Sequence, residues 1–396
     1  MRGEELLYKM SLAEPEFVEA AERRPVKRKA KWISWGAAAA CICIALFGAM
    51  VFGGRENTAL QPISIPEYET GGMGFEGYMV YDPSELENGS PWTADAELET
   101  LPVYKNLAYD PSGAGVPKGL SEDEMRKKLH ETADALGLEI VSEEVITDGY
   151  ELVEGKTVPS DVPTRIEAET ALGTLSVWAN AHIRLDFGLE DGIELPDEYS
   201  FTYSGTSDAE AEAVLGYLAE RYAAAFGYEN TAAVSWADRD IYGEQNRRYN
   251  LYEYSGDPVE DILNFNLRKI GFSPNEEGEL WLIGADDALS VAEKIGDYPI
   301  VGLEEATQRL VEGYYSTSVP FAMPGEEYIA RVELMYRSGP LEEILLPYYR
   351  FYVLLPDTDG WIMERENGLK TYGAYYVPAI ADEYITDMPV YDGHFN

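Results

Sequence analysis

One uncharged run near the N-terminus constrains this chain more than any other feature. Residues 32–54 are 23 side chains without a charge, rich in Ala, Gly and Ile. As an α-helix they would extend about 34 Å, enough to cross a hydrocarbon core about 30 Å thick. Interfacial Trp side chains and a preceding basic cluster are typical of a membrane anchor. The sequence therefore predicts a transmembrane helix over residues 32–54, anchored by Trp32, Trp35, Arg28, Lys29 and Lys31.

The charge distribution predicts how this helix is oriented. Residues 1–55 hold nine Lys/Arg and six Asp/Glu, whereas residues 56–396 hold 21 Lys/Arg and 66 Asp/Glu. Because cytoplasmic flanks carry the excess of Lys and Arg, the N-terminus is expected in the cytoplasm and the acidic part outside the cell. Both cysteines, Cys41 and Cys43, lie inside the uncharged run, so the exterior part can form no disulfide. This suits the plasma membrane of a Gram-positive bacterium, crossed in a single pass through the lipid bilayer.

Two other interpretations of residues 32–54 compete with the anchor. A signal peptide would have an unusually long leader, and no clear small-x-small cleavage site follows the apolar run. A buried helix of a soluble protein is rarely apolar all round and preceded by six cations. We therefore prefer the anchor.

The first 31 residues form a predicted cytoplasmic stub that ends in the basic juxtamembrane run. Leu6, Leu7 and Met10 fall on one helical face, and a second short piece carries Phe17 and Val18 on one side. Isolated helices this short are marginal in water and cannot bury such a stripe alone. We expect these five side chains to bind a partner as a helix laid in a groove. The competing interpretation is a leader without function.

The remainder divides into three predicted parts and gives the fold class. The class is α+β: one N-terminal transmembrane helix followed by an ectodomain of antiparallel sheets with packed helices. Because a helix followed by hairpins occurs at least twice, repeated helix-plus-hairpin modules are a further hypothesis. The predicted parts are a Gly/Pro-rich stalk at 55–119, a first α+β module at 120–285, and a second, PepSY-like module at 286–396.

Local signals predict the helices and strands of these modules. Two capping boxes, Ser121 to Glu124 and Ser207 to Glu210, open helices that end near residues 136 and 226. The other expected elements are a helix at 303–313, a strand pair at 262–270 and 279–283, and strands at 328–336, 347–355 and 369–380.

Composition and motifs exclude several classes of function. A formal net charge of −42 argues against nucleic-acid binding, because phosphate contacts need a basic face. Three His and two Cys make zinc centres and most His-dependent catalysis improbable. The segments at 238–240 and 357–360 begin like calcium loops but lack the later ligands. We therefore expect no metal, no cofactor and no enzymatic activity, and we expect the Tyr-rich C-terminal strands to be core packing.

Several runs carry a resemblance to a known group. The stub, basic run and Ala-rich span resemble Gram-positive single-pass proteins regarded as anti-sigma factors, as do the runs at 74–78, 101–106, 346–351 and 372–378. The helix at 303–313 with the strand at 328–336 is similar to PepSY-type and cell-wall-kinase regulatory domains. Zinc-type anti-sigma domains use one His and two Cys, and residues 1–31 contain neither. If this stub holds a sigma factor, it does so through its apolar stripe.

The resemblance implies a membrane-anchored, non-enzymatic regulator of transcription. In this hypothesis the stub binds a cytoplasmic partner such as a sigma factor, and the acidic ectodomain senses or docks something at the cell surface. The alternative is a surface interaction protein with an inert stub that binds a cationic ligand or a cell-wall component. A surface hydrolase would need a catalytic constellation that the sequence does not present. The sequence does not identify the extracellular ligand.

Overall fold

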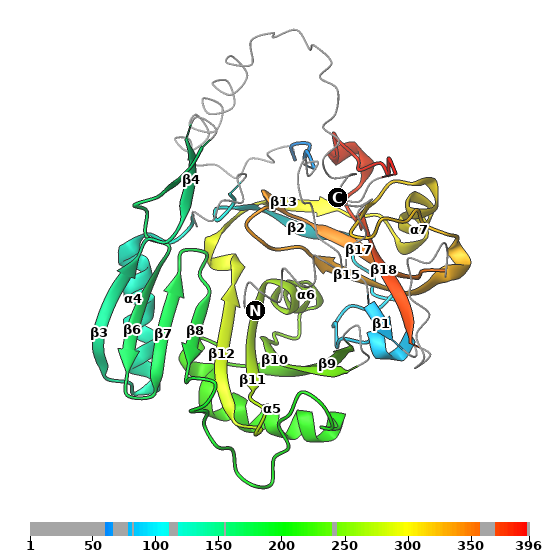
Figure 1. Ribbon diagram of the computed structural model, residues 1–396. Coiled ribbons are helices and arrows are strands. Elements are labelled where there is room, and N and C mark those ends of the chain that lie inside the picture. Colours follow the sequence, from blue (N-terminus) through cyan, green and yellow to red (C-terminus); the bar gives the residue numbers. More distant parts are fainter. Residues whose placement is uncertain are drawn as a thin grey trace, which may run out of the picture. The chain divides into compact units, whose positions relative to one another are not determined.

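A computed structural model describes residues 60–65, 78–80, 83–110, 118–153, 156–239, 244–356 and 369–393. These residues belong to one of two units of the chain, Leu60–Asn396. Within them, antiparallel sheets of eight, five and three strands combine with one hairpin and four α-helices (Figure 1). The helices are α4 (Glu122–Leu136), α5 (Asp208–Tyr222), α6 (Pro258–Leu267) and α7 (Leu303–Glu312).

The eight-stranded sheet is built from two similar halves. In each half a helix is followed by four antiparallel strands: α4 by β3, β6, β7 and β8, and α5 by β9, β10, β11 and β12. The halves join where their last strands, β8 and β12, pair antiparallel. The strands are β3 (Ile140–Ile146), β6 (Arg165–Thr170), β7 (Gly173–Trp178), β8 (Ile183–Asp186), β9 (Thr231–Arg239), β10 (Gln245–Glu253), β11 (Arg268–Pro274) and β12 (Leu280–Asp287).

Both helices that open these halves cover the same face of the sheet. Helix α4 packs on β6 and β7, and α5 packs on β9 and β10. Strand residues two apart, such as Leu175 and Val177, point into this core, because side chains alternate between the faces of a strand. The capping boxes predicted at Ser121 and Ser207 are confirmed: each serine accepts from the backbone of the glutamate three residues later. We call the side of the eight-stranded sheet opposite these two helices its outer face.

The two smaller sheets form the rest of the unit. The five-stranded sheet comprises β1 (Tyr78–Val80), β14 (Ser316–Thr317), β15 (Ile329–Tyr336), β17 (Pro347–Leu354) and β18 (Lys370–Pro378). The three-stranded sheet comprises β13 (Ala292–Pro299), β2 (Thr100–Asn106) and β16 (Ile344–Leu345). A hairpin of β4 (Tyr150–Val153) and β5 (Lys156–Pro159) extends from the chain between β3 and β6. The short 3-10 helices are η2 (Pro83–Leu86), η3 (Ala223–Phe226), η4 (Ala288–Val291), η5 (Glu326–Tyr328) and η6 (Asp382–Tyr384).

Helix α6 connects the large sheet to the second core. It is inserted between β10 and β11, and its Ile262, Leu263 and Leu267 pack with the five-stranded sheet and α7. Its Phe265 instead packs with Val234 and Tyr252 on the outer face of the eight-stranded sheet. Strand β2, which lies in the segment predicted as a stalk, is the central strand of the three-stranded sheet.

The tyrosines of β17 and β18 are core residues, as the sequence predicts. Their side chains are at most 3% exposed, and Tyr349 packs edge-on against Trp92. Several phenol groups satisfy backbone carbonyls, as Tyr349 does at Val301 and Tyr375 does at Phe321. The buried set is Tyr348, Tyr349, Tyr352, Tyr372, Tyr375 and Tyr376.

The predicted membrane-spanning fold is wrong on this structure. No helix among the described residues is long and apolar enough to cross a bilayer. The longest of them, α4 and α5, have 15 residues each, which is about 22 Å and short of a hydrocarbon core. The uncharged run 32–54 and its anchor residues Trp32, Trp35, Arg28, Lys29 and Lys31 lie outside the described residues. The predicted single-pass location in a plasma membrane, with a cytoplasmic N-terminus, is corrected with it.

The expected helix-plus-hairpin repeat is also corrected. The recurring unit has a helix and four strands, and both copies lie between residues 122 and 287 in one continuous sheet. Residues 262–267, predicted as strand, are the second half of α6. Asp257 caps this helix by accepting from the backbone of Val259 and Glu260, and Pro258 occupies its first turn. This local cap outweighed the apolar alternation that favoured a strand.

Two glycines provide a direct test of the sheet geometry. Gly173, the first residue of β7, has φ of 141°, and a Cβ there would overlap the carbonyl oxygen of Asp186 on β8. Gly137 ends α4 with φ of 66° and has open space around it. We expect Gly137→Ala to lower the free energy of unfolding by about 1 kcal/mol and Gly173→Ala by about 3 kcal/mol or more, measured by urea unfolding. Equal losses would contradict the close approach of β7 and β8.

Candidate functional site

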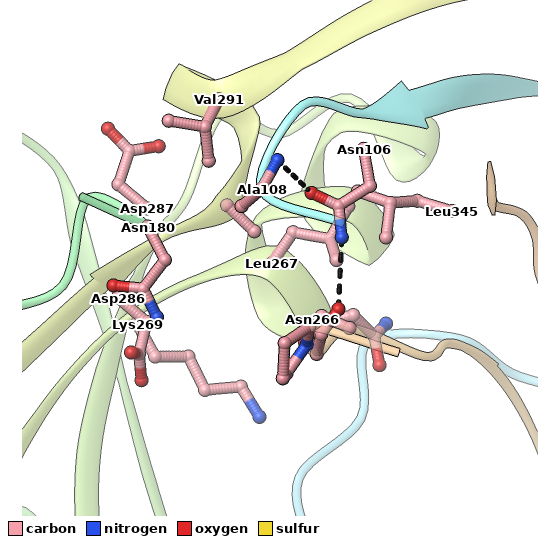
Figure 2. A pocket seen from close by; sticks show the side chains of 14 residues that line it. Asn106, Ala108, Asn180, Asn266, Leu267, Lys269, Asp286, Asp287, Val291 and Leu345 are labelled. Atoms are coloured by element: carbon pink, nitrogen blue, oxygen red, sulfur yellow. Dashed lines mark hydrogen bonds between the residues drawn. The ribbon is translucent and has the colours of Figure 1, made fainter. Parts of the chain in front are cut away.

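A small polar cavity lies between the eight-stranded sheet and the three-stranded sheet. Its volume is about 240 Å³, and its lining comes from the ends of β2, β11, β12 and α6, from η4, and from the loop after β15 (Figure 2). The lining residues are Asn106, Ala108, Asn180, Asn266, Leu267, Lys269, Asp286, Asp287, Ala288, Val291, Ser338, Gly339, Pro340 and Leu345. We call this space the junction cavity.

Lys269 is the cation of the junction cavity. It lies on β11 between Arg268 and the buried Ile270, so its side chain points to the outer face of the sheet. Its Nζ lies 4.2 Å from the ring centroid of Phe265 and 5.7 Å from that of Trp236. Within the described part of the chain, no acceptor pairs with this ammonium. Aromatic faces stabilise a cation but leave its N–H groups without an acceptor.

The surroundings disfavour the charged form of Lys269. Burial lowers the pKa of Lys269 to about 8, and the neighbouring positive charge of Arg350 adds to this shift. The negative charges of Glu333 and Asp286 oppose it but do not cancel it. The ammonium is therefore held at a cost to folding stability, as buried charges without a counter-ion are.

Close by, the five-stranded sheet carries a buried carboxylate among several donors. Glu333 is 1% exposed and accepts from Arg350 Nε at 2.5 Å, Asn88 Nδ2 at 2.7 Å and the Tyr352 hydroxyl at 2.9 Å. Burial would raise the pKa of Glu333, but Arg350 and these hydrogen bonds hold it below the usual value. Arg331 lies 3.9 Å away, and its buried Nε has no hydrogen-bond partner in the described structure. Two arginines, Arg331 and Arg350, therefore lie beside the buried carboxylate of Glu333 in the described structure.

Strand β12, which neighbours β11, ends in two carboxylates with different roles. Asp287 is engaged: it caps η4 through Ser290 and lies 3.6 Å from Lys128 Nζ. Asp286 binds His182 through one oxygen only, with 2.7 Å between Oδ1 and Nδ1. Its side chain is 69% exposed, so the second oxygen is open to a ligand.

Asn106 fixes the shape of the cavity. Its amide nitrogen donates to the carbonyls of Gly339 at 2.9 Å and Glu342 at 2.8 Å, and its oxygen accepts from the backbone of Ala108 at 2.9 Å (Figure 2). These bonds tie the end of β2 to the loop after β15. The amide of Asn106 is therefore engaged in holding this wall.

The site residues predicted from the sequence lie elsewhere. The partner-binding residues Leu6, Leu7, Met10, Phe17 and Val18 and the predicted anchors are outside the described residues, so partner binding by the stub stays a prediction. In the described residues no group of three or more His, Cys, Asp or Glu is placed to hold a metal ion. Residues 240 and 357–360 of the calcium-loop segments are also outside them.

The junction cavity was missed for a physical reason. The sequence does carry one signal, a basic pair at 268–269 within the apolar pattern of β11. The groups that make Lys269 unusual come from other strands and from α6, and Asp286 and Arg350 are 17 and 81 positions away in the chain. Only the folded sheet brings them together.

Comparisons with known proteins do not assign this site. No model of a known protein family matches the chain, and no curated protein matches its sequence. The function must therefore be argued from the geometry.

Lys269 should reduce stability at neutral pH. Its pKa in the folded chain is about 8 against a usual 10.5, so the unfolded state binds more protons between these values. The stability penalty is full below pH 8 and is relieved as the pH rises toward 10.5. We expect Lys269→Met to raise the free energy of unfolding at pH 7 by about 1–3 kcal/mol, and the gain to shrink above pH 8.

The matched control is Lys127→Met on α4. Lys127 is exposed and lies 3.8 Å from Glu131, so its removal should change the free energy of unfolding by less than about 0.5 kcal/mol. Urea unfolding at several pH values measures both variants. A loss of stability in Lys269→Met at pH 7 would show that the ammonium is well compensated and contradict this account.

Proposed function

We propose that this chain is a non-enzymatic binding protein that takes a small anionic ligand at Lys269 in the junction cavity. One observation carries the proposal: an ammonium without an ion pair faces a polar cavity in a chain with 72 acidic and 30 basic side chains. Other described lysines without an ion pair, such as Lys105 and Lys370, are exposed, whereas Lys269 is largely buried, where a lysine usually has a partner. A charge kept at a cost to stability is typical of a functional site.

The proposal retains a regulatory role from the sequence analysis. A regulator needs a site that senses a signal, and the junction cavity supplies one between two layers of the fold. The partner expected for the stub, such as a sigma factor, is a separate part of the same proposal. That part rests on the sequence of residues 1–31 alone.

The test of anion binding is a pH series with propionate, followed by calorimetry. A carboxylate needs the protonated lysine, so the affinity of the chain for propionate should fall by more than about ten-fold between pH 7 and pH 9.5. Lys269→Met should abolish binding at both pH values. Lys269→Arg keeps its charge throughout and should remove the pH dependence.

Lys127→Met is again the control and should bind as the parent chain does. Undiminished binding of propionate to Lys269→Met would place the anion elsewhere. Absence of propionate binding to the parent chain at pH 7 would overturn the proposed function.

A second candidate function is docking of a cationic partner in a groove along α7. This groove has a volume of about 840 Å³ and is lined by Glu304, Glu305, Glu312 and Asp382. Arg309 in its wall is held by Glu305 at 3.1 Å and Asp382 at 2.7 Å, and it donates to the carbonyls of Pro378 and Ile380. One structural cation is therefore surrounded by more carboxylates than it neutralises. This arrangement supports the surface-interaction alternative of the sequence analysis.

We expect a short oligolysine peptide to bind the chain, measured by fluorescence anisotropy. Glu304→Gln with Glu312→Gln should weaken binding about three- to ten-fold, because both carboxylates line the groove. Glu326→Gln, on η5, is a matched control outside this lining. Raising the salt to about 0.5 M should abolish the difference between variants. If the double variant and Glu326→Gln bind the peptide equally at low salt, the peptide is attracted by the overall surface charge and not by this groove.

A further inference from the structure

The geometry points to a small zwitterion, a free α-amino acid, as the ligand of the junction cavity, its carboxylate bound by Lys269 and its ammonium by Asp286. This inference rests on the proposed function and names the ligand class of that site. It begins from the register of two strands. Lys269 on β11 and Asp286 on β12 are direct cross-strand partners on the outer face.

Opposite charges in this position normally pair with each other. Directly opposed residues of an antiparallel pair have Cβ atoms about 5 Å apart, within easy reach of a Lys–Asp ion pair. Here each charge is directed elsewhere: Lys269 runs to the rings of Phe265 and Trp236, and Asp286 turns to His182. Figure 2 shows the two side chains leaving neighbouring strands and diverging. A gap with a cation at one end and a carboxylate at the other is left between them.

Third groups hold both charges in these positions. The rings of Phe265 and Trp236 hold the lysine over the β10 side of the sheet. His182, on the segment leading into β8, holds one oxygen of Asp286, and the backbone carbonyl of Asp286 accepts from the Tyr228 hydroxyl at 3.0 Å. The charges are thus pre-organised apart, which lowers the cost of binding a ligand between them.

A ligand that complements this gap must carry both charges within a few atoms. An anion alone would satisfy Lys269 and leave Asp286 facing a second negative charge. An amine alone would satisfy Asp286 and leave Lys269 facing a second positive charge. A carboxylate and an ammonium on one carbon satisfy both, through charge-assisted hydrogen bonds.

The size and lining of the cavity limit the rest of the ligand. A volume of about 240 Å³ is below the roughly 300–1,000 Å³ of pockets for drug-sized ligands, so the molecule is small. Apolar side chains in the lining offer room for a short aliphatic group; they are Ala108, Leu267, Val291 and Leu345.

The experiment compares amino acids with analogues that lack one charge. Isothermal titration of the full chain at pH 7 uses alanine, valine, their des-amino analogues propionate and isovalerate, and ethylamine. We expect at least one amino acid to bind about ten-fold or more tightly than its des-amino analogue, and ethylamine not to bind. Asp286→Asn should lower the affinity for that amino acid to the level of its analogue, and it should leave the affinity for the analogue equal or higher, because a neighbouring negative charge is removed.

The analogues distinguish the proposed anion site at Lys269 from the inferred amino-acid site formed by Lys269 and Asp286. If Asp286→Asn still binds propionate, the variant is folded at the site. A loss of amino-acid binding then shows that the ligand ammonium needs the negative charge of Asp286. If amino acids and des-amino analogues bind equally in the parent chain, the zwitterion is excluded while the anion site stands. If neither class binds, the proposed function fails together with this inference.

Discussion

The pairing of β8 with β12 is the contact on which the architecture depends. Each half of the large sheet is a helix with four strands, and a half alone would expose the edge of its last strand. The register places Leu185 opposite Ile283 and Ile183 opposite Ala285, so the core side chains of the two halves meet in one layer. The same register fixes which residues share the outer face. The β11–β12 register within the second half places Lys269 beside Asp286, and the pairing of β8 with β12 brings His182 to Asp286.

A second constraint is the distribution of charge inside an acidic protein. The excess of carboxylates is solvated on the surface, where it costs little. Among the described residues, the interior near β11, β15 and β17 instead holds the cations Lys269, Arg331 and Arg350 close to the buried carboxylate of Glu333. In the proposed function, Lys269 attracts an anion at close range in a low dielectric, where its charge acts more strongly than the screened charge of the surface. The junction cavity is the proposed place of binding.

Much of the local structure could be predicted, because it is encoded by neighbouring residues. Capping boxes gave the starts of α4 and α5, the strands β15, β17 and β18 followed from alternation, and α7 ended at its glycine. Where local signals conflicted, the stronger one decided: the Asp257 cap and Pro258 made a helix of residues that alternate like a strand. The membrane-spanning prediction failed for another reason. It rested on one uncharged segment, residues 32–54, which lies outside the described residues, and no described helix is long and apolar enough to span a bilayer.

The sequence by itself determined the acidic excess, the helix caps and the alternating strands, since each depends on composition or on residues within a few positions of one another. The tertiary structure alone decided the sheet order, the joining of two helix-plus-four-strand halves and the junction cavity. These depend on strand register, and register is set by how distant apolar faces pack together. The burial, charges and aromatic ring that distinguish Lys269 come from β12, α6 and β17. The sequence around Lys269 therefore does not single it out, and the folded chain does.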